Sequence, residues 1–102
     1  MKLLTKELIE KLPKLYSQEN SDDPDVHIKY FTPDSSWTWL ILEGGKTEEG
    51  DFLFFCNVLS PMTPEGELGY VTLSELKNAR GPLGLPIEID IYFSPRKLSE
   101  CK

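Results

Sequence analysis

Two carboxylates in the stretch Ile87–Phe93 (IEIDIYF) have a spacing that acid–base chemistry could use. Glu88 and Asp90 alternate with isoleucines, so a strand would present both carboxylates on one face. General acid–base catalysis requires that one of the two keep a raised pKa inside a cleft. Because no such cleft is indicated by the sequence, we interpret the pair first as a solvent-facing strand surface and second as a candidate site.

Arg80 is the next candidate, because it lies at the end of an expected helix. A cation in the last turn suits the helix dipole, so we expect Arg80 to cap the C-terminal end of that helix. The alternative is that its guanidinium binds an anion in a pocket. In that case the protein would be a small ligand-binding domain or an enzyme that uses Glu67, Tyr70, Arg80, Glu88 and Asp90.

The sequence contains no pattern for a metal site or a cofactor. His27 is the single histidine, and Cys56 and Cys101 have no paired spacing, so we expect free thiols in a reducing cytoplasm and no bound metal. The run GGKT at 44–47 is not a phosphate loop, because Leu40 stands where the first glycine of that motif belongs.

Aromatic side chains exceed what two short helices can cover. Large apolar groups are usually inside a protein, so a core role is the default for most of them. The surplus predicts a surface that a partner or a second copy of the chain would cover, with Trp37 and Trp39 as the leading binding residues. The aromatic set is Tyr30, Phe31, Trp37, Trp39, Phe52, Phe54, Phe55, Tyr70, Tyr92 and Phe93.

Two short helices are predicted from capping patterns. Thr72 and Glu75 have the spacing of a capping box, and the following residues predict a helix over Leu73–Arg80 that stops at glycine and proline. A first helix of about two turns should begin at Thr5 and break near Pro13, which has no amide proton to donate.

Alternating or continuous apolar residues predict the strands. In the last strand Ile87, Ile89, Ile91 and Phe93 should point inward. The third strand is apolar on both faces, so it should lie inside the sheet. Together these elements predict an α+β fold, with a mainly antiparallel sheet of about five strands and two short helices. The predicted strands are Val26–Phe31, Trp37–Leu42, Phe52–Leu59, Leu68–Val71 and Ile87–Phe93.

The chain has the length of one domain, which we expect over residues 1–102 with flexible loops near 17–25 and 43–51 and a polar tail at 94–102. It carries 17 acids and 11 bases, a formal charge of −6, and no cluster of bases, which disfavours nucleic acid as a partner. No long apolar run predicts a membrane span, and the charged start does not resemble a signal peptide, so we expect a cytoplasmic protein.

Seven short blocks in order are similar to a known family. The chain resembles the domain of unknown function 2958 family, small bacterial proteins often found on mobile elements, and the resemblance implies no established activity. The chain departs from it at Ile89, where members often have arginine, and at Cys56, where they often have glycine. The blocks are KLLTKEL, HIKYFTP, WTW, LFF, ELGY, LSEL and RGPLGLPIE.

The leading hypothesis is a non-enzymatic cytoplasmic module that binds an unknown protein partner. The resemblance adds that it could be an accessory or counter-defence factor of a mobile element. A weaker alternative is single-stranded nucleic acid binding, with bases stacked on Trp37 and Trp39. A homodimer is a further alternative for the same aromatic surface.

Overall fold

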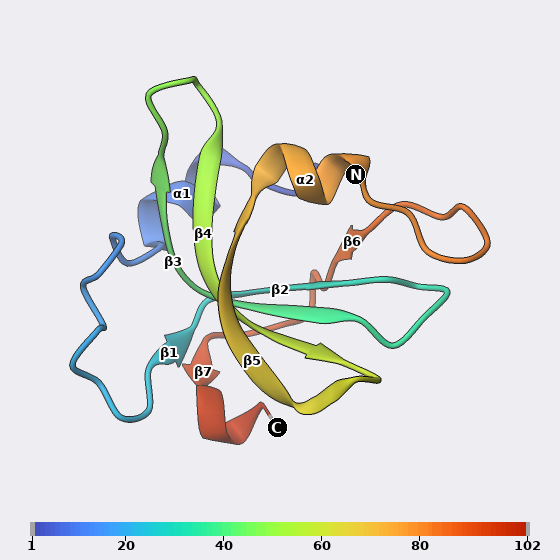
Figure 1. The fold of residues 1–102 in the computed structure, drawn as a ribbon. Coiled ribbons are helices and arrows are strands. Elements are labelled where there is room, and N and C mark those ends of the chain that lie inside the picture. The colour runs from blue at the N-terminus through green and yellow to red at the C-terminus, as the bar shows by residue number, and fades with distance from the viewer. Residues whose placement is uncertain (1, 102) are drawn as a thin grey trace.

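The computed structural model describes residues 2–101, and within them the chain forms a main sheet of five antiparallel strands in the order β5-β4-β3-β2-β6 (Figure 1). Met1 and Lys102, the two ends of the predicted domain, lie outside the described residues. The sheet and its two short helices confirm the predicted α+β fold. The strands are β2 (Ile28–Phe31), β3 (Thr38–Lys46), β4 (Phe52–Ser60), β5 (Thr63–Thr72) and β6 (Glu88–Ile89).

Both predicted helices form, and both have the predicted N-caps. Helix α1 (Lys6–Lys11) begins after Thr5, whose hydroxyl accepts a hydrogen bond from the Leu8 amide, and it ends at Leu12 before Pro13. Helix α2 (Leu73–Asn78) begins with the complete capping box of Thr72 and Glu75. It ends two residues earlier than predicted, because Arg80 already forms an antiparallel bridge with Pro86.

One face of the main sheet, called here the helix face, carries Ile28, Tyr30, Ile41 and Phe54 and packs against residues of both helices. The Tyr30 hydroxyl donates to the carbonyl of Leu3 at 2.6 Å, which ties the N-terminal segment to the sheet. Burial raises the pKa of the Tyr30 hydroxyl well above its usual value, so the hydroxyl stays protonated and remains a donor.

The cysteines are free, as predicted. Cys56 is fully buried in the helix-face core, and burial raises the pKa of its thiol to about 12. Its Sγ donates to the carbonyl of Gly69 on β5 at 3.6 Å. Cys56 therefore acts as a small apolar core residue rather than as a reactive thiol.

A β-bulge in β3 changes the loop that was predicted at 43–51. The register shifts between Ile41 and Glu43, so Leu42 and Glu43 both face away from the helices. The strand continues to Lys46, and the hairpin turn shrinks to residues 47–51. Glu43 is 2% exposed, and its carboxylate accepts hydrogen bonds from the amides of Tyr16 at 2.6 Å and Gln18 at 2.8 Å.

The other face of the main sheet, called here the opposite face, is partly covered by the C-terminal segment. A small two-stranded sheet pairs β1 (Asp25–Val26) with β7 (Arg96–Lys97), and a 3-10 helix, η1 (Leu98–Glu100), follows. Val26 packs there with Leu40 and Leu42. The predicted polar tail at 94–102 thus contains two elements that lie against the sheet (Figure 1).

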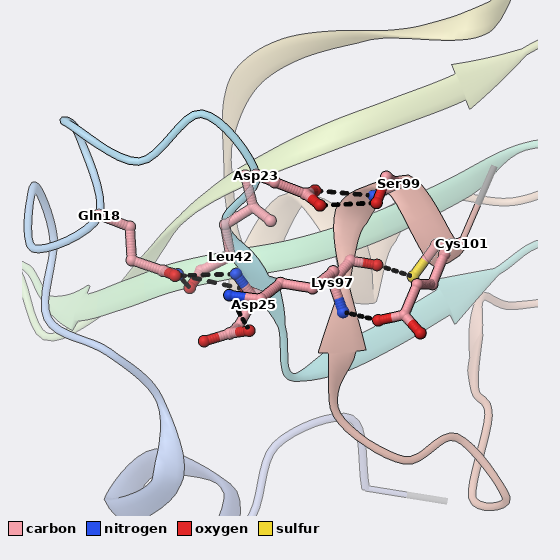
Figure 2. Close-up of polar contacts among 8 residues, drawn as sticks. Gln18, Asp23, Asp25, Leu42, Lys97, Ser99 and Cys101 are labelled. Carbon is pink, nitrogen blue, oxygen red and sulfur yellow. Dashed lines mark hydrogen bonds and ion pairs between the residues drawn. The ribbon is translucent and has the colours of Figure 1, made fainter.

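Polar contacts hold this segment to the loop at 17–25, which was predicted to be flexible (Figure 2). The side chain of Gln18 donates to the carbonyl of Leu42 and accepts from the amide of Asp25. Asp23 accepts from both the amide and the hydroxyl of Ser99, at 2.9 and 2.6 Å. The Leu98 amide also donates to the carbonyl of Pro24, so hydrogen bonds join the two segments beside the apolar packing of Leu98.

Besides β3, which runs four residues beyond the predicted Trp37–Leu42, three strand predictions were wrong in extent. The strand predicted at Val26–Phe31 is interrupted at His27, so Val26 belongs to the small sheet. The final strand covers only Glu88–Ile89, because the Asp90 side chain accepts from the Tyr92 amide and turns the chain. Ile91 is therefore 64% exposed instead of inward-facing. Strand β5 is longer than the predicted Leu68–Val71, since proline is tolerated in an edge strand.

Candidate functional site

A groove at the β2–β6 edge brings together three of the residues singled out from the sequence: Trp37, Glu88 and Asp90. It has a volume of about 510 Å³, which lies in the range of pockets that hold small molecules or a few side chains. This β2–β6 groove is lined by Lys29, Phe31, Thr32, Ser35, Trp37, Thr38, Glu88, Ile89, Asp90, Ile91 and Tyr92.

The turn between β2 and β3 positions Trp37 at the groove. The Thr32 amide donates to the carbonyl of Trp37 at 3.0 Å, and the Trp37 amide donates to the Thr32 hydroxyl at 3.2 Å. That hydroxyl also lies 2.5 Å from the hydroxyl of Ser35. Because the turn closes on itself through these bonds, the backbone of Trp37 is held at the start of β3, from where the indole reaches the groove.

The loop 81–85 packs against the same turn. Asp34 accepts a hydrogen bond from the amide of Leu83 at 2.8 Å. Gly81 lies so close to this carboxylate that a Cβ on it would overlap the Asp34 side chain. The sequence RGPLGLP thus contacts the turn between β2 and β3, and it carries the chain from α2 to the groove edge at β6.

The charges in the groove are unevenly matched. Asp90 lies 4.0 Å from the ammonium of Lys29, with the two side chains 29% and 36% exposed, so the pair is a partly solvated contact. Glu88 lies opposite Phe31 in the β2–β6 ladder, and among residues 2–101 its carboxylate has no ion-pair partner. The lining contains one lysine and two carboxylates, so the groove has a net negative charge.

The two tryptophans differ in exposure. Their rings stack with centroids 6.0 Å apart. Trp39 packs against the helix-face core, whereas Trp37 is 40% exposed and reaches the groove. Of the two tryptophans predicted to bind a partner, only Trp37 thus has an exposed ring at the groove. Trp39 packs between that ring and the core.

Glu67 and Tyr70 lie far from this groove, on β5 at the other edge of the main sheet. Tyr70 is 53% exposed, and its ring is 5.0 Å from that of Phe55. Desolvation raises the pKa of the Tyr70 hydroxyl, and the hydrogen bond to Tyr16 and the negative charge of Glu43 raise it further. The hydroxyl therefore stays neutral across the physiological pH range.

Arg80 caps the C-terminal end of α2, the interpretation that the sequence favoured. Its Nη1 donates to the carbonyl of Lys77 at 2.8 Å and to the carbonyl of Ala79 at 2.7 Å. Lys77 lies in the last turn of the helix and Ala79 is its C-cap, where a cation also suits the helix dipole. Arg80, Glu67 and Tyr70 are thus not brought to one place with Glu88 and Asp90.

The groove offers hydrogen-bond acceptors and aromatic surface but no paired nucleophile and base. Its hydroxyl groups come from Thr32, Ser35, Thr38 and Tyr92, and neither histidine nor cysteine lines it. Within residues 2–101 no cluster of three or more acidic, histidine or cysteine side chains could hold a metal ion. No helix in the same range is long and apolar enough to cross a membrane.

The sequence indicated the two carboxylates and Trp37, and the strand faces also allowed Lys29 to pair with a carboxylate on a neighbouring strand, which the contact with Asp90 confirms. It did not indicate Phe31 and Tyr92 as neighbours of these residues. Alternation in HIKYF did place Lys29 and Phe31 on one face. The pairing of Phe31 with Glu88 joins segments 57 positions apart, so their proximity depends on the register of β2 with β6. Tyr92 reaches the groove only because the chain turns at Asp90.

Comparison with known proteins places the chain in a family. The profile of a family described as a protein of unknown function, DUF2958, matches residues 3–100. The chain belongs to that family. No curated protein and no solved structure matches it significantly. The DUF2958 match spans both edges of the main sheet and the C-terminal segment, so the β2–β6 groove and the cover of the opposite face lie within the family region.

Proposed function

We propose that this protein is a non-enzymatic protein-interaction module that accepts part of a partner protein in the β2–β6 groove. The observation that carries the proposal is the meeting of the exposed Trp37 indole with the unpaired Glu88 carboxylate in one hollow of about 510 Å³. Tryptophan is one of the residues most enriched at interaction hot spots, and a carboxylate beside it attracts a side chain of opposite charge. The partner side chain that fits is a lysine or arginine.

The groove favours a protein partner over the other two hypotheses. Glu88 and Asp90 would repel nucleic acid phosphates, although Trp37 could stack on a base. The proposed enzyme site would need Glu67, Tyr70 and Arg80 beside the two carboxylates. The first two lie at the opposite sheet edge, and Arg80 is engaged with helix carbonyls. The formal charge of −6 suits a basic partner surface.

The proposal includes action in the cytoplasm as an accessory or counter-defence factor of a mobile element. This context rests on the family resemblance. The free cysteines fit a reducing compartment.

Selection from a displayed library of random peptides tests the groove directly. We expect the selected peptides to share a lysine or arginine next to an apolar residue. Trp37→Ala should weaken their binding about tenfold or more, since it removes the aromatic wall. Glu88→Gln should reduce the preference for the basic residue while leaving the fold intact.

Leu83→Ala is the matched control, because Leu83 is 79% exposed and lies outside the groove. It should bind the selected peptides as the native protein does. Peptides without a basic residue, or equal binding by Trp37→Ala with an unchanged circular dichroism spectrum, would overturn the proposal.

A further inference from the structure

We propose a second interaction surface at the opposite edge of the main sheet, where β5 binds an extended basic segment of a partner chain as an added strand. This β5 surface consists of the outer edge of Glu67–Thr72 and the side chains of Phe55, Leu68 and Tyr70. It lies at the other edge of the sheet from the β2–β6 groove. The two surfaces would also bind differently, because main-chain hydrogen bonds would supply much of the contact at β5.

The outer edge of β5 is open along its second half. Within residues 2–101, β5 pairs with β4 alone, and the ladder runs without a shift from Val58–Glu67 to Leu53–Thr72. Proteins protect such edges with proline, lysine, bulges or irregular backbone. Here Pro64 and Gly66, whose φ is +92°, lie in the first half of the strand, and the stretch Glu67–Thr72 has neither proline nor lysine.

Apolar side chains lie beside this open edge on the opposite face. Leu68 and Tyr70 are 57% and 53% exposed, and they project from alternate positions of β5 to the side of Phe55. The C-terminal segment covers Leu40 and Leu42 in the middle of this face but leaves Leu68 and Tyr70 largely uncovered. An added strand would extend the sheet and cover these two side chains.

A hollow next to Leu68 gives an added segment room for a side chain. The hollow has a volume of about 410 Å³, and its lining includes Phe55, Asn57, Leu68 and Gln18. Asn57 is 3% exposed, and its Oδ1 accepts no hydrogen bond from any described residue. This oxygen has almost no exposed surface and lies against Gly66, so the hollow offers a bound segment space and a partly apolar lining rather than this acceptor.

The negative charge around the β5 surface favours a positively charged partner segment. The loop 17–25 and the strand β5 carry six acidic residues and no lysine or arginine. Two of the acids already have partners, because Asp25 pairs with Lys97 and Asp23 binds Ser99. The others surround the hollow and the edge, so a basic segment is favoured. A second copy of the chain would bring two acidic edges together and is disfavoured. The remaining acids are Glu19, Asp22, Glu65 and Glu67.

Titration of the isotopically labelled full chain with synthetic peptides tests the proposal by NMR. The probe is a ten-residue peptide in which lysine alternates with threonine and valine. Two matched peptides serve as comparisons: one has glutamate for lysine, and the other has lysine but is N-methylated at alternate amides. We expect the lysine peptide to bind with a dissociation constant below about 1 mM and to shift the amides of residues 67–72. Both comparison peptides should bind at least about tenfold more weakly.

Variants separate this surface from the β2–β6 groove. Leu68→Ala and Tyr70→Ala should each weaken binding of the lysine peptide. Both side chains are exposed enough for the fold to survive their loss. A peptide with lysine next to valine would also fit the β2–β6 groove, so the affinity for β5 is taken from the amides of residues 67–72 alone. Trp37→Ala, which changes the groove, should leave the shifts of these amides unchanged, and this keeps the test independent of the function proposed above.

Three results would overturn the inference. The first is the absence of amide shifts at a peptide concentration of about 1 mM, which is the upper limit of the expected dissociation constant. The others are equal binding of the N-methylated peptide and shifts confined to the residues of the β2–β6 groove. If the native protein formed a dimer through β5 in solution, a second copy of the chain would be the occupant of this edge, and the inference of a basic partner segment would be wrong.

Discussion

Among residues 2–101 the helix face of the main sheet buries a cluster of ten side chains, whereas the opposite face buries a cluster of three. Helices α1 and α2 cover the first face with apolar residues such as Leu8 and Leu76. The C-terminal segment covers the second with few apolar residues and several polar contacts, including those of Asp23 with Ser99. One face is thus organised for stability, while the other leaves surface free at both sheet edges.

The largest loss of stability is expected from a substitution on the helix face. Phe54 is fully buried between the rings of Tyr30 and Phe52, at centroid distances of 5.8 and 5.1 Å. Phe54→Ala should lower the free energy of unfolding by about 3–5 kcal/mol, measured by urea denaturation. Leu98→Ala on the opposite face should lower it by only about 1 kcal/mol, because that side chain is half-buried. Equal losses would show that the two faces contribute equally.

The next effect concerns the buried carboxylate that fastens the loop after α1 to the opposite face. Glu43→Ala leaves the amides of Tyr16 and Gln18 without their acceptor. We expect a loss of about 2–3 kcal/mol, since hydrogen bonds to a charged group are among the stronger ones. Glu48→Ala, at an exposed position of the hairpin turn, should change stability by less than about 0.5 kcal/mol. A small loss in Glu43→Ala would mean that water replaces the carboxylate.

A smaller effect is expected at the cap of α2. Thr72→Ala removes the hydroxyl that accepts from the Glu75 amide at 3.2 Å. Thermal denaturation should show a loss of about 1 kcal/mol, and Thr72→Ser should restore most of it. If serine failed to restore stability, the methyl group of Thr72 rather than its cap would be the stabilising part.

The smallest effect depends on pH. Hydrogen bonds from Ser74 and from the Phe52 amide hold the pKa of Asp51 below its ordinary value of 3.8. Because the folded-state pKa is lowered, this contribution to stability is present above pH 3.8 and is lost as the pH falls through the folded-state value. Asp51→Asn should therefore flatten the dependence of the unfolding free energy on pH in that acidic range. An unchanged slope would assign the acid sensitivity to other carboxylates.

The difference between the faces also explains which features could be predicted from the sequence. The caps of α1 and α2 are local, so the spacing of Thr72 and Glu75 was enough to place the helix start. The alternating pattern of Ile28 and Tyr30 likewise predicted a strand of the core. These features depend on neighbours only a few positions away.

The remaining features depend on contacts between distant segments. Glu43 is buried although it is charged, and it follows the apolar residues of β3. The sequence alone therefore offered no reason to extend β3 past Leu42, because the bulge that turns Glu43 to the opposite face is visible only in the structure. The C-terminal segment has little apolar periodicity, because contacts such as Ser99 with Asp23 join residues 76 positions apart. The candidate groove was predicted only in part for the same reason, since its members meet through the register of β6 with β2.

The bulge in β3 also determines where the chain tolerates insertions and deletions. Beyond it, Gly44 lies on the helix face, where a Cβ would come within 2.5 Å of the Phe52 ring. Removing one residue between 42 and 46 would exchange the faces of the positions that follow, so that the glycine leaves its crowded place and a larger side chain enters it. Changes in length within the turn at 47–51 leave this alternation untouched. Length variation in this hairpin should therefore be confined to the turn.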